Sequence, residues 1–357
     1  MGTLLWKPEW ERTRKRFSAW WRREGLVLCV TAPARTPHAQ IADPEPPRDA
    51  HMQWTDPRYR LAHAESRLAR TYFGGEAFPS FDPEMGPGNL ATFIGSEPHY
   101  VAETVWFSPC ITDPENHPPL QFDPAETNFR IQMAIIEAAL AARAGRYVVG
   151  LPDLIENVDT LVSLRGMETL LADMLDRPAC IEERVAQVNA AWFAAYDCLY
   201  ARVKDEWGGS TWACFFIWGE GKTAKLQCDA SATFSPAMLR RFVVPGITAQ
   251  CRYLDNSLYH LDGMQCLVHL DELLSIDELD AIQWTAGAGR ALGGDPQWYD
   301  LYRRILAGGK CVMAVEVKPR EVVPLLDAVG PQGMFIKVEA ESEEEARALE
   351  EKVEAYR

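Results

Sequence analysis

From about residue 125 to its end, the chain alternates short apolar runs of strand type with helical stretches. The strand candidates lie at 147–151, 210–218, 224–231, 257–260, 280–284, 311–317 and 333–338. The helix candidates lie at 124–143, 160–175, 178–203, 236–254, 298–307, 319–328 and 342–356. Strands and helices that alternate and end in a helix are typical of a parallel barrel. The sequence therefore predicts an α/β fold, a (β/α)8 barrel of the TIM type.

The first 120 residues differ, because proline, glycine, tryptophan and histidine break any regular period there. Basic residues between positions 12 and 23 interleave with Trp10, Phe17, Trp20 and Trp21. This pattern indicates an amphipathic helix, which either docks on the barrel with a solvated basic edge or binds a lipid or an anion. We expect residues 1–70 to form a helix-and-loop extension packed on a single barrel domain, residues 71–357.

The charge and composition of the chain indicate which kinds of partner it can bind. A formal net charge of -15 argues against nucleic acid, since binding a phosphate backbone needs a basic face. No stretch approaches the roughly 18 apolar residues of a membrane span, and no signal peptide is visible. Nine cysteines without a Cys-x-x-Cys pair are typical of reduced thiols. We expect a cytoplasmic protein that acts on a small molecule, and a homodimer is compatible with the sequence.

The segment from Ser257 to Gly289 carries the clearest candidate site. An apolar run there ends in His260-Leu261-Asp262-Gly263. Alternation along a strand places the imidazole and the carboxylate on one side of the chain, at the carboxyl end where α/β enzymes keep their chemistry. The pair could share a divalent metal, or Asp262 could orient His260 for proton transfer. The alternative is a half-buried imidazole bonded to the backbone.

Other polar and aromatic residues also fall at the ends of predicted strands. The candidates for catalysis are Asp153, Asp229 and Glu316, and those for substrate binding are Asp82, Trp218 and Trp284. A carboxylate that ends a nearly all-apolar strand needs a partner or a function. For Asp229 a helix cap is the alternative, although Ser235 already serves that role. Glu339 precedes a solvated acidic run.

The segment "CDASATFSPAMLRRFVVPGITAQC", followed by "LDNSLYHLDG", resembles the uroporphyrinogen decarboxylase superfamily. "DTLVSLRGMETLLADMLDRPACIEERV" is similar to the helix pair before that superfamily's middle strand, and "GPGNLATFIG" and "AFPSFD" fit more loosely. The resemblance runs from about residue 70 onward. It implies a (β/α)8 barrel, and the superfamily also contains corrinoid-dependent methyltransferases.

Two departures from that superfamily bear on the reaction. Its decarboxylases carry an arginine-rich segment near the amino terminus, whereas residues 25–40 here offer only Arg35. Its methyltransferases bind zinc through His-x-Cys and a late Cys, whereas this chain has His260, Asp262 and Glu339 at the corresponding places. The resemblance therefore implies a site with harder ligands, for zinc or another divalent ion.

We expect an enzyme that transfers a methyl group between a small methylated compound and a corrinoid protein or another acceptor. His260 and Asp262 would bind the metal or polarise the acceptor, and Trp218 and Trp284 would form an apolar wall. One alternative is a metal-independent decarboxylase or lyase of a small carboxylic acid, in which Asp82 or Asp229 stabilises a cationic intermediate. Another is a non-catalytic barrel that binds a small molecule.

Overall fold

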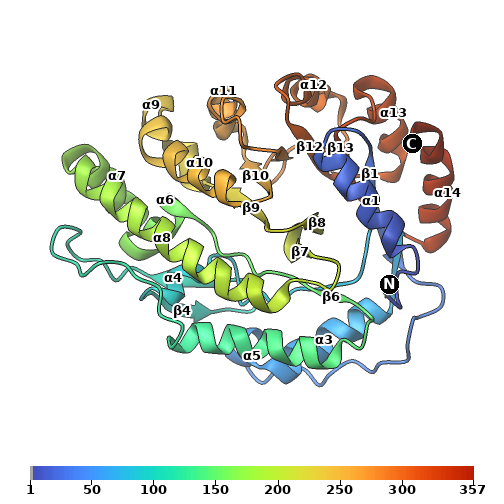
Figure 1. Cartoon of the computed structure of the whole chain (residues 1–357), viewed down its shortest axis with the longest axis horizontal. Helices are drawn as coiled ribbons and strands as arrows, with labels where there is room; N and C mark the ends of the chain where they lie inside the picture. Colours follow the sequence, from blue (N-terminus) through green and yellow to red (C-terminus); the bar gives the residue numbers. More distant parts are fainter. Residues whose placement is uncertain (1–2) are drawn as a thin grey trace.

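The computed structural model describes residues 3–357 as a mixed α/β fold around a sheet of mainly parallel strands (Figure 1). Seven strands are hydrogen-bonded in the order β2-β1-β13-β12-β11-β10-β9. Every neighbouring pair is parallel except β1 and β2. The strands are β1 (Val27–Pro33), β2 (Thr71–Gly75), β9 (Thr223–Gln227), β10 (Asn256–Asp262), β11 (Ala281–Thr285), β12 (Cys311–Val317) and β13 (Met334–Glu339).

Six short strands complete the β-structure. β3 (Ser80–Phe81) pairs in parallel with β6 (Val148–Val149), and an isolated parallel bridge joins Leu151 to Trp212. The antiparallel pairs are β4 (Glu97–Tyr100) with β5 (Val105–Ser108) and β7 (Gly209–Trp212) with β8 (Ile217–Glu220). The α/β class is thus confirmed, while closure of the strands into an eightfold barrel stays a prediction. The division at residue 70 also stays a prediction, although β1 of the main sheet falls before it.

Helices follow most of the strands, and Figure 1 shows α10 to α14 in an arc outside β9 to β13. The helices are α1 (Trp10–Trp21), α2 (Ala50–Thr55), α3 (Pro57–Ala69), α4 (Asn89–Phe93), α5 (Thr127–Ala142), α6 (Asn157–Arg165), α7 (Met167–Asp176), α8 (Pro178–Val203), α9 (Pro236–Met238), α10 (Val244–Tyr253), α11 (Leu270–Leu274), α12 (Tyr299–Ala307), α13 (Pro319–Val329) and α14 (Glu343–Val353). Among the described residues, none of these helices is long and apolar enough to cross a membrane.

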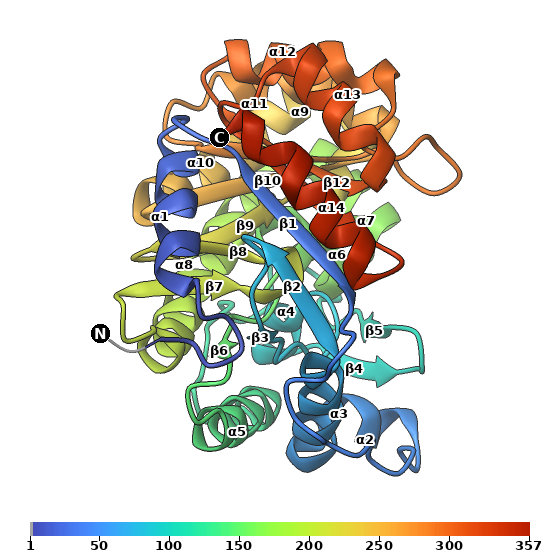
Figure 2. The ribbon, with the colours of Figure 1, turned by 90° about the vertical axis from the view of Figure 1, so that its right-hand side faces the viewer.

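Helix α1 packs against the amino-terminal ends of the sheet strands (Figure 2). The Trp20 indole N–H donates to the carbonyl of Gly333, just before β13, and the Cys311 thiol at the start of β12 donates to the carbonyl of Trp20. Phe17 is fully buried with its ring 5.7 Å from that of Phe335. The amphipathic pattern therefore marks a docked helix, and the opposite, carboxyl ends of the strands remain available for a site.

The chain between 210 and 218 corrects one expected strand. It forms β7, a single 3-10 turn at Ala213–Phe215, and then β8, which runs antiparallel to β7. Phe216 at the reversal has a φ of 58°, a left-handed conformation that bulky residues rarely adopt. The expected helix over 160–175 is likewise two helices, α6 and α7, because Gly166 with a φ of 84° breaks it. The first of these interruptions brings Phe215 and Phe216 next to the candidate site.

Candidate functional site

Three neighbouring strands present polar side chains at the same level of the sheet. In the parallel register Gln227 of β9 is the partner of His260 of β10, and His260 is the partner of Gln283 of β11. Strand side chains alternate between faces, so residues two apart share a face. Lys225, two residues before Gln227, and Asp262, two residues after His260, therefore lie on the same face as this row. The carboxyl ends of β9 and β10 thus converge on one polar site.

Asp229, His260 and Asp262 form the centre of this site. Their ligand atoms all lie within 4.8 Å of one another, and His260 Nε2 is 3.9 Å from Asp262 Oδ2. The other ring nitrogen, Nδ1, contacts the side-chain oxygen of Gln283, which fixes the ring orientation. The Oδ1 atom of Asp262 is buried without a hydrogen-bond partner among residues 3–357. A buried carboxylate oxygen that lacks a donor is the kind of atom that a bound cation satisfies.

The electrostatics of this trio suit metal ligation. Burial is the main cause that raises the pKa of Asp229 to about 6; Asp262 and Asp153 add to it, while Lys225 opposes it. Burial, and then the charge of Lys225, lowers the pKa of His260. At neutral pH the imidazole is therefore neutral and Asp229 is mostly ionised. These are the protonation states in which the two groups bind metal ions.

Lys225 and Asp153 form a buried ion pair beside the trio. Lys225 is fully buried, and its Nζ lies 2.8 Å from Asp153 Oδ1 and also contacts the side chain of Gln227. Burial alone would lower the pKa of Lys225, but Asp153 and Glu156 raise it above its usual value. Gln227 in turn donates to Asp229 Oδ2 at 2.9 Å. A chain of contacts thus links the predicted residues Asp153 and Asp229 through two residues that we did not predict.

Further acids stand close to Asp153. Asp82, predicted to bind substrate, and Glu84 interact electrostatically with Asp153 and with each other. Burial, then the charges of Asp82 and Asp153, raises the pKa of Glu84 to about 8. Asp159 accepts the backbone N–H groups of Asp229, at 2.6 Å, and of Ala230. Asp159 therefore positions the turn that carries Asp229.

The structure moves Trp218 and Trp284 away from this site, which corrects the expected apolar wall. Trp284 is buried on the opposite face of β11 from Gln283, with its ring 5.2 Å from that of Trp298. Trp218 donates its indole N–H to Asp205 Oδ2 at 2.7 Å and packs on Trp10 of α1. Aromatic contact at the site comes instead from Phe215, whose ring lies 5.2 Å from that of His260.

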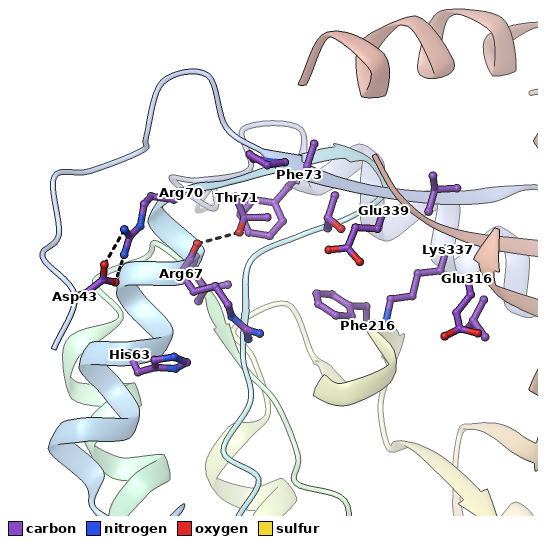
Figure 3. A pocket seen from close by; sticks show the side chains of 16 residues that line it. Asp43, His63, Arg67, Arg70, Thr71, Phe73, Phe216, Glu316, Lys337 and Glu339 are labelled. Carbon is purple, nitrogen blue, oxygen red and sulfur yellow. Dashed lines mark hydrogen bonds and ion pairs between the residues drawn. The ribbon is translucent and has the colours of Figure 1, made fainter. Parts of the chain in front are cut away.

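Glu316 and Glu339 line a neighbouring pocket of about 790 Å³ rather than the trio (Figure 3). Both are exposed, and Glu316, a predicted candidate for catalysis, lines this pocket instead of joining the trio. A register shift between β12 and β13, with a φ of 55° at Glu316, turns this residue out of the strand pattern. Glu339 does not belong to the group of ligand atoms around His260. The third acidic residue of that group is Asp229, whereas the resemblance implied Glu339.

Comparison with known proteins gives a likeness in fold. No protein-family model and no curated protein matches the chain. A solved structure, a methyltransferase from Methanosarcina mazei, superposes with a TM-score of 0.64 at 9% sequence identity. The match covers 96% of this chain and 99% of that one. The two proteins therefore share a fold over nearly their whole length.

The sequence held a signal for two of the residues that were missed. In "AKLQCDAS" the polar positions Lys225, Gln227 and Asp229 recur every second residue. This spacing places all three on one face of a strand. Lys225 and Gln227 could therefore have been predicted to lie on the same side as Asp229. Gln283 carried a weaker signal, since the neighbouring Trp284 is the larger side chain and no rule of spacing favoured either residue for the site.

Proposed function

We propose that this protein is an enzyme that transfers a methyl group between a small O- or N-methylated compound and a corrinoid protein or another acceptor. The observation that carries the proposal is the trio of Asp229, His260 and Asp262 at the carboxyl ends of β9 and β10. The full-length similarity in fold to a methyltransferase supports it. As part of the proposal, the strands close into a (β/α)8 barrel of the uroporphyrinogen decarboxylase superfamily.

The trio would hold a divalent metal ion. One imidazole and two carboxylates, with the unsatisfied Oδ1 of Asp262 among them, form a donor set that suits zinc or a harder ion. When bound, such an ion supplies a Lewis acid that activates the methyl acceptor or the leaving group. Gln283 holds the His260 ring in place, and Gln227 holds the carboxylate of Asp229.

The acids near Asp153 would exchange protons with the substrate. Glu84, whose pKa is raised to about 8, carries a proton at neutral pH and can donate it, whereas Asp153 is paired with Lys225 at 2.8 Å. Phe215 excludes water from one side of His260. A negatively charged site with an aromatic wall also suits a methylated ammonium group.

Elemental analysis of protein purified without chelators tests the proposed metal. We expect one divalent ion per chain in the wild type and in His99→Ala, a control at an exposed histidine away from the trio. His260→Ala should lose the ion and, with it, transfer of the methyl group of methylcobalamin to an added alcohol or amine acceptor, followed by absorbance. Protein free of metal in all three preparations would remove the metal from the mechanism and leave Asp229 and Asp153 as acid–base groups.

A second candidate is decarboxylation of a small carboxylic acid without metal. The closeness of Asp82 to Asp153 favours it, because carboxylates there could stabilise a cationic intermediate. Release of carbon dioxide that persists after chelator treatment and is lost in Asp82→Asn would support this reaction. If the protein also failed to transfer the methyl group of methylcobalamin, the proposal of methyl transfer would be wrong.

A further inference from the structure

Lys337 differs from the other lysines that the fold withdraws from solvent. Lys7 donates to the carbonyls of Phe73 and Gly75, both at 2.7 Å, and Lys225 pairs with Asp153. Lys310 donates to the carbonyl of Ile276. The half-buried Lys337 makes no hydrogen bond and no ion pair with any residue in the range 3–357. Its ammonium group lies over the ring of Phe216, at 4.7 Å from the centroid.

Lys337 lines the 790 Å³ pocket from β13 (Figure 3). Arg67, which is exposed, also lines this pocket from the last turn of α3, and its guanidinium has no ion pair within residues 3–357. Burial lowers the pKa of Lys337, opposed by Cys214, Cys29, Glu339 and Glu316. Two cations therefore face one cavity without a carboxylate in contact, in a chain that has 51 acids and only 36 lysines and arginines.

The position of Lys337 is costly unless an anion pairs with it. A cation withdrawn from water loses hydration, and only a paired anion or several hydrogen-bond acceptors restore it. Glu316 and Glu339 line the same pocket but are too far away to form ion pairs with Lys337. Their charges also disfavour a doubly charged ligand such as phosphate. A single negative charge on a planar group fits best, since Arg67 can bind it with two parallel hydrogen bonds.

We propose that Lys337 and Arg67 bind the carboxylate of a small organic acid, with Phe216 covering its apolar part. Phe215, the preceding residue, contacts His260, so the pocket adjoins the trio along one turn of chain. A carboxylate held here would place the rest of the molecule toward His260. The substrate of the proposed reaction is then a methylated carboxylic acid; this last step rests on the proposed function, whereas the binding of the carboxylate does not.

Calorimetric titration with methoxyacetate and its neutral analogue methoxyacetamide tests the site. We expect the acid to bind at least about tenfold more tightly than the amide, because a charge-assisted hydrogen bond contributes that much or more. Lys337→Met should abolish this difference, and Lys352→Met, a control on the exposed face of α14, should keep it. Acetate, propionate and N,N-dimethylglycine serve as further probes, and inorganic phosphate should bind more weakly than all of them.

Several outcomes would overturn the proposal. These are equal affinities of acid and amide, failure of every carboxylate to bind, or unchanged binding in Lys337→Met. Thermal unfolding separates function from stability: removing an unpaired charge should leave the midpoint of Lys337→Met unchanged or higher. If that variant does not fold, Lys337→Arg keeps the charge and should retain the preference for the acid. Binding that survives in His260→Ala would uphold this site even if methyl transfer failed.

Discussion

At the scale of single residues, the site depends on protonation states that the surroundings impose. Burial and the charge of Lys225 keep His260 neutral, and burial with two neighbouring carboxylates raises the pKa of Asp229 to about 6. The sequence alone predicted the His260 and Asp262 pair, because alternation in a strand places them on one face. It could not predict either pKa, since the groups that shift them come from other strands.

Asp262→Asn should lower activity much more than stability. The side chain of Asp262 is 38% exposed and lies 3.9 Å from the neutral ring of His260, so we expect the free energy of unfolding to change by less than about 1 kcal/mol. Loss of a negative charge in the proposed metal site should reduce turnover by at least about tenfold. Urea unfolding and a methylcobalamin assay on the same preparation compare the two effects. Equal losses would point to a structural role.

Retention of the proposed metal should fall as the pH drops through about 6. Asp229 must lose its proton to bind a metal ion, and protons compete for it below its pKa. Burial lowers the pKa of His260, which reduces competition by protons at the imidazole. Metal content after dialysis between pH 5 and 8 gives the midpoint. A transition unchanged in Asp229→Asn would show that another group controls it.

At the scale of elements, hydrophobic periodicity placed most helices and strands correctly, including the docked α1. It failed over 210–218, where a continuous apolar run looked like one strand but reverses at Phe216. It also failed for Trp218 and Trp284, because an apolar pattern does not tell which of two alternating faces a strand turns to the site. Contacts with α1 and with Trp298 decided that both indoles face away.

Phe17→Ala should destabilise the fold without changing the site. Phe17 is fully buried between Phe78 and Phe335, at ring distances of 5.8 and 5.7 Å. Loss of such a ring costs about 3–5 kcal/mol because the surrounding side chains collapse only partly into the cavity. Lys15→Ala, on the exposed face of the same helix, should cost less than about 0.5 kcal/mol. Denaturant unfolding measures both, and metal content per folded chain should equal that of the wild type.

At the scale of the whole molecule, several raised carboxyl pKa values link stability to pH. The pKa values of Glu84, Asp159 and Asp229 are raised to about 8, 6 and 6. The folded state therefore binds more protons than the unfolded chain between about pH 4 and 8, and stability falls as the pH rises through this range. The lowered pKa of His260 acts in the opposite sense below its unfolded value.

We expect the thermal midpoint to rise when the pH is lowered from 8.5 to 6.5. Protonation of Glu84 is the main contribution in this window and should add on the order of 1 kcal/mol to the free energy of unfolding. Glu84→Gln mimics the neutral form and should flatten the dependence. Glu351→Gln, at an exposed position on α14, should leave it intact. A midpoint that is constant over this range would contradict the assignment.

By itself the sequence determined the α/β class, the docked amphipathic helix and the His260–Asp262 pair, because each depends on a spacing of two or three to four residues along the chain. The tertiary structure decided which distant groups meet. It replaced Glu339 by Asp229 beside His260, paired Lys225 with Asp153, and left Lys337 unpaired next to Phe216. These outcomes depend on strand register and on one left-handed residue, which set distances between segments that local patterns do not encode.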